Sequence, residues 1–150
     1  MDHPVFLDSN IFMYAAGKPH RYKNPCLHIL KDVETKVLSA IINTEVLQEL
    51  LYRYAHIGIP EKGLQLCLDV LKYPVRILPV AEEDMRKAIE LFGQYRSKGL
   101  KPRDIVHAAT MKTSNITKIM SADKNFDVFD SLTRIDPLSY VPRTDKKESE

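Results

Sequence analysis

Short apolar runs alternate along the chain with longer segments in which apolar residues recur at helical spacing. A short apolar run that ends in polar turn-forming residues is typical of a buried strand. On this pattern we predict strands at Val5–Leu7, Val37–Ser39, Val75–Val80, Lys118–Ser121 and Thr133–Ile135.

The intervening segments predict helices. They cover Ile11–Ala16, Tyr22–Val33, Val46–Tyr54, Leu64–Leu71, Glu82–Ser97 and Arg103–Thr113. We expect Ser9 or Asn10 to cap the first helix, and Asn43 or Thr44 to cap the third. Strands alternating with helices indicate an α/β fold with a mostly parallel sheet.

The length of 150 residues fits one domain, which we place at residues 1–142. Residues 143–150 are polar and carry no core pattern, so we expect a disordered tail. No apolar run approaches the roughly 20 residues of a membrane span. Cys26 and Cys67 form no disulfide or metal pattern, which favours buried packing and a reducing cytoplasm. The net charge of +2 decides little about partners.

Acidic residues follow the predicted strands. Asp8 comes directly after the first strand and Asp123 follows the strand that ends at Ser121. The carboxyl ends of parallel strands lie at one edge of the sheet, where α/β proteins bind ligands. Asp104 begins a late helix and Glu49 lies in the helix after the second strand. Taken singly, each acid has an ordinary interpretation as a helix cap, a turn residue or a solvated helix residue.

As a set, the acids predict a metal site. Clustered carboxylates raise one another's pKa, and a divalent cation relieves their repulsion. Ligands that are all oxygen select a hard ion such as Mg²⁺ or Mn²⁺. Such a site can hydrolyse a phosphodiester. The number of ions stays open.

Four motifs together resemble the PIN-domain family, and within it the VapC toxin ribonucleases. The motifs occur in order as Val5-Phe6-Leu7-Asp8-Ser9-Asn10, Glu45-Val46-Leu47-Gln48-Glu49-Leu50, Arg103-Asp104-Ile105-Val106-His107-Ala108-Ala109 and Ser121-Ala122-Asp123-Lys124-Asn125-Phe126-Asp127. The resemblance implies a three-layer fold with a five-stranded, mostly parallel sheet flanked by helices. It also implies an endoribonuclease that depends on Mg²⁺ or Mn²⁺.

The resemblance assigns roles to particular residues. It implies that the metal ligands and catalytic residues are Asp8, Glu49, Asp104 and Asp123. It implies supporting roles for Asn10, Ser121 and, less directly, Asp127. Glu45 lies one helical turn before Glu49 and is the alternative ligand, although the motif places the functional acid directly before a leucine.

The resemblance also implies partners: an RNA substrate, a small antitoxin that blocks the acidic site, and a second copy of the chain bound through the early helices. A PIN-fold module that binds RNA or protein without cutting it is the alternative, as is a free-standing RNA-processing nuclease. The RNA target stays open.

Other residues have ordinary explanations at this stage. We interpret His107 as a packed core histidine, because the proposed chemistry does not require it. Tyr14, Tyr22, Tyr52 and Tyr54 follow helical patterns and favour core or interface packing over base stacking. A phosphatase of the haloacid dehalogenase type would need an acid where Asn10 stands. The sequence has no glycine-rich nucleotide-binding loop.

Overall fold

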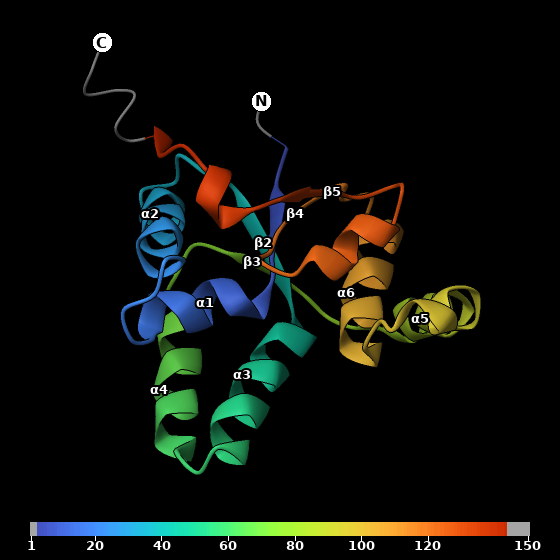
Figure 1. Cartoon of the computed structure of the whole chain (residues 1–150), viewed down its shortest axis with the longest axis horizontal. Coiled ribbons are helices and arrows are strands. Elements are labelled where there is room, and N and C mark those ends of the chain that lie inside the picture. Colours follow the sequence, from blue (N-terminus) through green and yellow to red (C-terminus); the bar gives the residue numbers. More distant parts are fainter. Residues whose placement is uncertain (1–2, 144–150) are drawn as a thin grey trace.

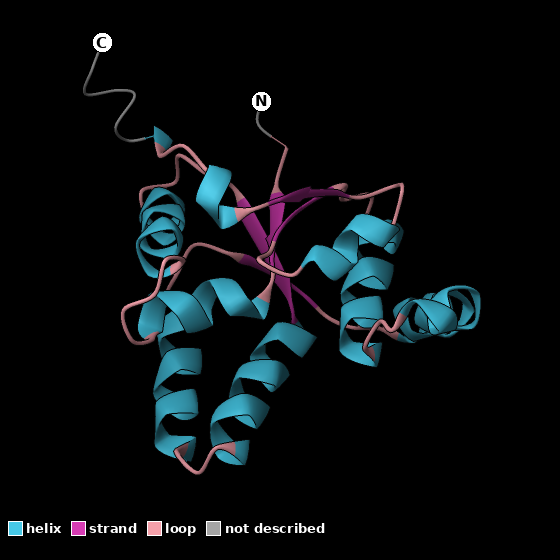
Figure 2. Cartoon of the chain, viewed as in Figure 1, coloured by secondary structure: helices cyan, strands magenta, loops and turns pink. Residues whose placement is uncertain are grey.

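The computed structural model describes residues 3–143 of the chain. Within these residues, five strands form one parallel sheet in the order β3-β2-β1-β4-β5. The strands are β1 (Val5–Leu7), β2 (Ala40–Asn43), β3 (Arg76–Leu78), β4 (Lys118–Met120) and β5 (Thr133–Ile135). The sheet lies at the centre of the molecule with helices around it, as Figure 2 shows. The predicted α/β class and five-stranded sheet are therefore confirmed.

The described part contains six α-helices and three short 3₁₀ segments. The helices are α1 (Ser9–Ala16), α2 (Lys23–Glu34), α3 (Thr44–His56), α4 (Pro60–Val70), α5 (Glu82–Tyr95) and α6 (Pro102–Thr113); the 3₁₀ segments are η1 (Arg96–Lys98), η2 (Lys124–Val128) and η3 (Pro137–Ser139). In Figure 1, α1 and α2 lie on one side of the sheet and α5 and α6 on the other, while α3 and α4 form a hairpin beyond its lower edge. No described helix is both long enough and apolar enough to cross a membrane.

Strand β1 is the central strand, between β2 and β4. Its register pairs Phe6 with Ile41 on one side and with Ile119 on the other. The chain therefore leaves β1 toward β2 and later returns to pair β4 on the opposite side. Such a reversal of strand order is where open α/β sheets bind ligands, beyond the carboxyl ends of the strands. Here the residues beyond those ends begin with Asp8 and Ser121.

The core explains why the strands appear as continuous apolar runs. Phe6, Leu7 and Ile42 are fully buried, and every residue of β1 and β2 is buried. A parallel sheet that is covered by helices on both faces places both sets of alternating side chains in the core. The central strands therefore give a rigid base to the residues that follow them.

The second predicted strand is displaced in the structure. We expected it at residues 37–39, but β2 begins at Ala40. The backbone amides of Val37 and Leu38 both donate to the carbonyl of Asp32, so these residues complete the turn that ends α2. Lys36 has a φ of 65°, in the left-handed region that commonly follows a helix. The apolar pair belongs to this turn, and Leu38 still contributes to the core.

Two further details differ from the expectations, and the predicted cap of the third helix is confirmed. The first helix is capped by Asp8 rather than by Ser9 or Asn10, because the Asp8 carboxylate accepts from the Ser9 amide. Asn43 caps α3, as predicted, by accepting from the Val46 amide. Arg143, which we assigned to the tail, donates from its backbone amide to buried Asp32 and from its guanidinium to the carbonyl of Val37. Residues 144–150 of the predicted tail lie outside the described residues.

The α3–α4 hairpin depends on a glycine at its contact. A Cβ atom at Gly63 would lie 3.1 Å from both the carbonyl oxygen of Leu50 and the Cβ of Tyr54. That is closer than ordinary van der Waals contact, so a larger side chain would push the two helices apart. The close packing at Gly63 involves Tyr54, which lines the pocket described below.

Candidate active site

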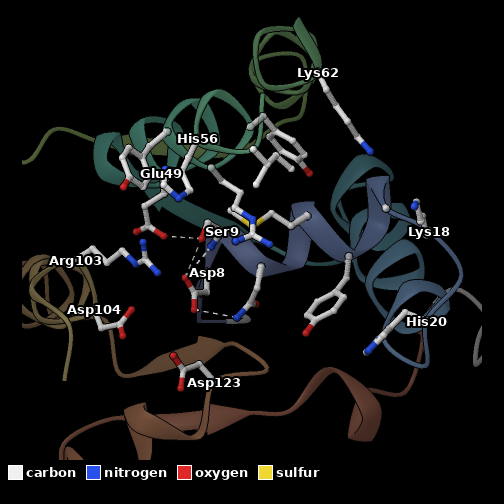
Figure 3. A pocket seen from close by; sticks show the side chains of 18 of the residues that line it. Asp8, Ser9, Lys18, His20, Glu49, His56, Lys62, Arg103, Asp104 and Asp123 are labelled. Carbon is white, nitrogen blue, oxygen red and sulfur yellow. Dashed lines mark hydrogen bonds between the residues drawn. The ribbon is translucent and has the colours of Figure 1, made fainter. Parts of the chain in front are cut away.

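A pocket of about 580 Å³ opens beside the carboxyl ends of β1 and β4. The four predicted acids, Asp8, Glu49, Asp104 and Asp123, all line it. They come from the end of β1, from α3, from the first turn of α6 and from the segment after β4. Figure 3 shows their carboxylates around one space beside Asp8. Residues more than one hundred positions apart therefore meet at the strand-order reversal.

Asp8 is held by hydrogen bonds on both carboxylate oxygens. Its Oδ1 accepts from the Ser9 amide at 2.8 Å, and its Oδ2 accepts from the Ser121 hydroxyl at 2.6 Å. The side-chain amide of Asn10 donates to Oδ2 of Asp8 at 3.3 Å and to the Ser121 hydroxyl at 3.1 Å. Burial raises the pKa of Asp8, and the neighbouring His107 opposes that rise. Asn10 and Ser121, which the sequence singled out, therefore both contact this acid.

Glu49 is held in the same manner by two different residues. Its Oε2 accepts from the Ser9 hydroxyl at 2.6 Å, and its Oε1 accepts from Nε2 of His107. Burial alone would raise the pKa of Glu49, but the hydrogen bond and charge of His107, followed by Ser9, lower it below its usual value. Ser9 thus links Asp8 and Glu49, with its amide on one and its hydroxyl on the other.

His107 belongs to the site as well as to the core. It is fully buried, and its Nδ1 lies 3.1 Å from the side-chain amide of Asn43. The Asn43 oxygen accepts from the Val46 amide, so its nitrogen faces His107 and donates to Nδ1. Nε2 therefore carries the proton that Glu49 accepts. Burial alone would lower the pKa of His107, but Glu49 and then Asp8 raise it.

Asp104 differs from the first two acids. It is 4% exposed, and its Oδ2 is buried without a hydrogen-bond partner among residues 3–143. Burial, together with the negative charges of Asp8 and Asp123, raises its pKa to about 7. An unpaired carboxylate oxygen in a cluster of acids is costly to keep ionised unless a cation is close to it.

Asp123 is half-buried and less constrained. Its carboxylate accepts from the Asn125 amide at 2.9 Å, while its own amide donates to the Ser121 hydroxyl at 3.0 Å. Asp123 lines the pocket together with Asp104, and Figure 3 shows both carboxylates near Asp8. Ser121 therefore contacts Asp8 and the backbone of Asp123 through one hydroxyl, and so links the residues that follow β1 and β4.

Two acids that the sequence singled out lie outside the pocket. Glu45 is half-buried on α3 and does not line the pocket, whereas Glu49, one turn later, does. Asp127 is paired with Arg134 at 2.9 Å, and Arg134 donates to the carbonyl of Ser121. Its link to the site is therefore indirect.

Two sets of ligands could hold a divalent cation, one with His107 and one with oxygen ligands only, and both include Asp8 and Glu49. Ligand atoms of Asp8, Glu49 and His107 all lie within 4.8 Å of one another. However, the proton on Nε2 of His107 removes the lone pair that a metal would need. The unpaired Oδ2 of Asp104 is a free oxygen ligand. The oxygen set of Asp8, Glu49, Asp104 and Asp123 therefore suits a hard ion better.

Sequence reasoning missed the roles of Ser9 and His107. Ser9 was considered as a helix cap, and its position next to Asp8 gave no sign that its hydroxyl would face α3. His107 follows Asp104 by three residues, which places both on one helix face, and that spacing was the available signal. Cys26 and Cys67 are free and buried, as the sequence favoured.

Comparison with known proteins agrees with this geometry. The PIN domain family model matches residues 5–132. The chain is 31% identical over 132 residues to VapC ribonuclease Mb1869c of Mycobacterium bovis, covering 87% of this chain and 98% of that protein. It is 30% identical over 119 residues to ribonuclease VapC23 of Mycobacterium tuberculosis, covering 79% and 92%.

Solved structures give the same fold at lower identity. The structure of VapC20 from Mycobacterium tuberculosis, described as a toxin that cleaves the sarcin-ricin loop, matches with a TM-score of 0.71 and 14% identity over 83% of this chain and 93% of that one. VapBC2 from Rickettsia felis, bound to a promoter DNA fragment, matches with a TM-score of 0.68 and 20% identity over 89% and 98%. By sequence and by fold, this chain belongs to the PIN-domain family, among its VapC-like members.

Proposed function

We propose that this chain is an endoribonuclease that requires Mg²⁺ or Mn²⁺ and acts as the toxin of a toxin–antitoxin pair. Asp8, Glu49, Asp104 and Asp123 would hold the cation and carry the catalysis. Relatives named as VapC ribonucleases support the activity. The observation that carries the metal proposal is the buried, unpaired Oδ2 of Asp104 facing other acids. When bound, such an ion would polarise the phosphodiester and activate water.

The residues around the acids prepare them for this task. Ser121 and Asn10 donate hydrogen bonds to Asp8, while Ser9 and His107 donate to Glu49, so the protein itself holds both carboxylates. Hydrogen bonds of this kind fix ligand geometry and reduce the cost of rearrangement on binding. Because the pKa of Asp104 is raised to about 7 without a cation, a bound metal would displace a proton from this acid near neutral pH. Arg103 lines the pocket between Glu49 and Asp104 in Figure 3, where it can face a substrate phosphate.

The cleavage test uses total RNA with Mg²⁺, with Mn²⁺ or with excess EDTA. We expect discrete fragments with either metal, none in EDTA and none from Asp8→Asn or Asp104→Asn. Asp130→Asn is the matched control, because Asp130 is exposed and does not line the pocket. Equal cleavage in EDTA would contradict the metal mechanism, and equal cleavage by Asp8→Asn would contradict the site.

The proposed partners are a small antitoxin and a second copy of the chain. Solved structures with the same fold include a toxin–antitoxin complex from Klebsiella pneumoniae and VapBC-5 from Mycobacterium tuberculosis, a member of the VapBC family of toxin–antitoxin systems. An antitoxin that inserts a basic side chain among the four acids would neutralise them and block RNA. Large exposed apolar side chains lie on α3, on α4 and directly after it, and on α5, with fewer on α1 and α2, and they would give both partners apolar surface: Leu51, Tyr52, Leu64, Leu68, Leu71, Met85, Ile89 and Phe92.

Co-purification from the native host tests the antitoxin, and sedimentation of the purified chain tests the dimer. A small protein that co-purifies and abolishes cleavage is the expected result. An active chain with no such partner would be a free-standing nuclease. A sedimentation coefficient of a single chain at micromolar concentration would contradict the dimer.

A further inference from the structure

The pocket extends well beyond the four acids. From the acidic end it continues past Tyr14 to the α1–α2 loop and to the outer part of the α3–α4 hairpin. In Figure 3, Lys18, His20 and Lys62 lie on the opposite side of the view from Glu49 and Asp104. The whole volume of about 580 Å³ lies within the roughly 300–1,000 Å³ typical of ligand pockets. The cation requires only the acidic end, so the remainder needs another explanation.

Two aromatic rings form one wall of this outer part. The rings of Tyr14 and His20 are stacked, with centroids 4.9 Å apart and planes at 25°. Behind them, the buried Tyr22 lies 5.0 Å from Tyr14 and 5.7 Å from His20. His20 is exposed and Tyr14 is half-buried, and both line the pocket. We call Tyr14 and His20 the aromatic pair.

Hydrogen bonds fix the aromatic pair in place. Nδ1 of His20 accepts from the Tyr22 amide at 3.1 Å, and the His20 carbonyl accepts from the Lys23 amide at 3.0 Å. The ammonium of Lys23 donates to the carbonyl of Gly17 at the start of the loop. The Tyr22 hydroxyl donates to Asp136 at 3.2 Å. A surface loop with this many internal contacts presents its rings in one orientation, which lowers the entropy cost of binding.

Exposed cations line this outer part, whereas the acidic end holds the carboxylates of the pocket with Arg103 beside them. Lys18 and Lys62 are exposed and line it, and the ammonium of Lys62 lies 5.5 Å from the centre of the Tyr54 ring. The carboxylates that line the pocket are the four at the metal end. A bound strand could therefore place one phosphate at the acids and neighbouring phosphates beside these cations.

We propose that the aromatic pair is a stacking site for an unpaired base of a single-stranded RNA segment, and that Lys18 and Lys62 contact the phosphates beside it. This inference rests on the proposed ribonuclease function and names the form of its substrate. Exposed rings next to cations are the combination by which proteins bind single strands, because every base has a face that can stack. A base inside a duplex is already stacked on both faces, so the pair selects against double-stranded RNA.

The test measures binding separately from cleavage. All variants carry Asp8→Asn, which keeps the RNA intact, and the probe is a fluorescein-labelled single-stranded RNA of roughly ten nucleotides, a length within the range of known single-strand sites. Fluorescence anisotropy gives the affinity. We expect His20→Ala to weaken binding roughly tenfold or more, and His20→Phe, which keeps a ring, to retain most of the affinity. His28→Ala is the control, because His28 is exposed on α2 outside the pocket.

Two further arms examine charge and strandedness. Lys18→Ala and Lys62→Ala should each reduce the slope of log affinity against log salt by about 0.7, the value per phosphate contact for single strands, and Lys31→Ala should not. Annealing the probe to its complement should weaken binding and remove the effect of His20→Ala. Unchanged binding by His20→Ala would overturn the proposal, and so would an equal loss in His20→Phe.

The failure of this proposal can be distinguished from the failure of the proposed function. If the unmodified chain cuts RNA with metal and Asp8→Asn does not, the nuclease function holds whatever His20→Ala does. If His20→Ala then binds and cuts like the unmodified chain, the stacking site alone is refuted. If the unmodified chain neither binds nor cuts RNA, both proposals are refuted.

Discussion

The two halves of the acidic site are built differently. Asp8 and Glu49, on the side of β1 and α3, each receive side-chain hydrogen bonds from neighbours that leave them little freedom. On the side of α6 and β4, one buried oxygen of Asp104 has no hydrogen-bond partner within residues 3–143, and the Asp123 carboxylate accepts from the backbone amide of Asn125. The protein thus holds the carboxylates of one half with side-chain hydrogen bonds and leaves a buried oxygen of the other half without a partner within residues 3–143. A cation between the halves would bind two carboxylates that hydrogen bonds already hold, Asp8 and Glu49, and one carboxylate oxygen that has no hydrogen-bond donor in the described part of the chain, Oδ2 of Asp104.

The largest expected effect separates two acids on one helix. Glu49→Gln should reduce the rate of RNA cleavage at least a hundredfold, because it removes a charged ligand from the hydrogen-bonded half. Glu45→Gln should change the rate less than about threefold, since Glu45 does not line the pocket. Single-turnover cleavage rates at saturating Mn²⁺ measure both. A greater loss in Glu45→Gln would show that the alternative acid is the ligand.

Removing His107 would destabilise the half of the site that contains Asp8 and Glu49. His107→Ala leaves Oε1 of Glu49 without its donor and creates a cavity beside Phe6 of β1, so we expect the free energy of unfolding to fall by about 3 kcal/mol or more. Urea denaturation measures this loss. His28→Ala, which removes an exposed ring from α2, should unfold like the unmodified chain. A loss in His107→Ala no larger than in the control would mean that the contact to Glu49 contributes nothing.

Ser121→Ala tests the link between the halves. The substitution leaves an oxygen of buried Asp8 without its short hydrogen bond, which costs about 1–3 kcal/mol. Activity should fall as well, because the same hydroxyl accepts from the Asp123 amide. Urea denaturation and cleavage rates measure the two effects. Ser114→Ala is the control, an exposed serine at the end of α6, and equal behaviour of the two variants would contradict the link.

The half of the site that contains Asp104 predicts that stability depends on pH, with an effect smaller than those of the substitutions above. The pKa of Asp104 is raised to about 7 from its ordinary value of 3.8, so the folded state holds this proton more tightly than the unfolded state. The stabilisation is complete below the ordinary pKa and is lost as the pH rises through about 7. In EDTA, the melting temperature should therefore fall by a few degrees between about pH 5 and about pH 8.

Asp104→Asn should flatten that decline, and Mg²⁺ should raise the melting temperature more at the higher pH, where the acids are ionised. Differential scanning fluorimetry over this range measures both. A decline that is as steep in Asp104→Asn as in the unmodified chain would assign the pH dependence to other groups, such as Asp8.

The comparison of the two halves also shows what the sequence could and could not predict. Asp8 and Asp123 could be placed together from strand ends alone, because a parallel sheet brings those ends to one edge. Glu49 and Asp104 needed the motif resemblance, since a helix position does not fix which way a side chain faces. The role of Ser9 could not be predicted, because it depends on the distance between α1 and α3.

The fold was predictable where burial on both faces gave continuous apolar runs, as in β1. The position of β2 was not, because Val37 and Leu38 are apolar residues that complete the turn after α2. The aromatic pair was also missed. Tyr14 follows a helical pattern and His20 has no partner spacing, and their stacking depends on the path of the α1–α2 loop.

The most direct test of the account is calorimetric titration of Mn²⁺ into the metal-free chain at about pH 8. The account predicts binding that weakens at least tenfold in Asp104→Asn, because that variant replaces the one buried acid whose oxygen has no partner in the described structure. Asp130→Asn, an exposed acid outside the pocket, should bind like the unmodified chain. Equal affinity of Asp104→Asn and the unmodified chain would contradict the proposal that these acids form one metal site.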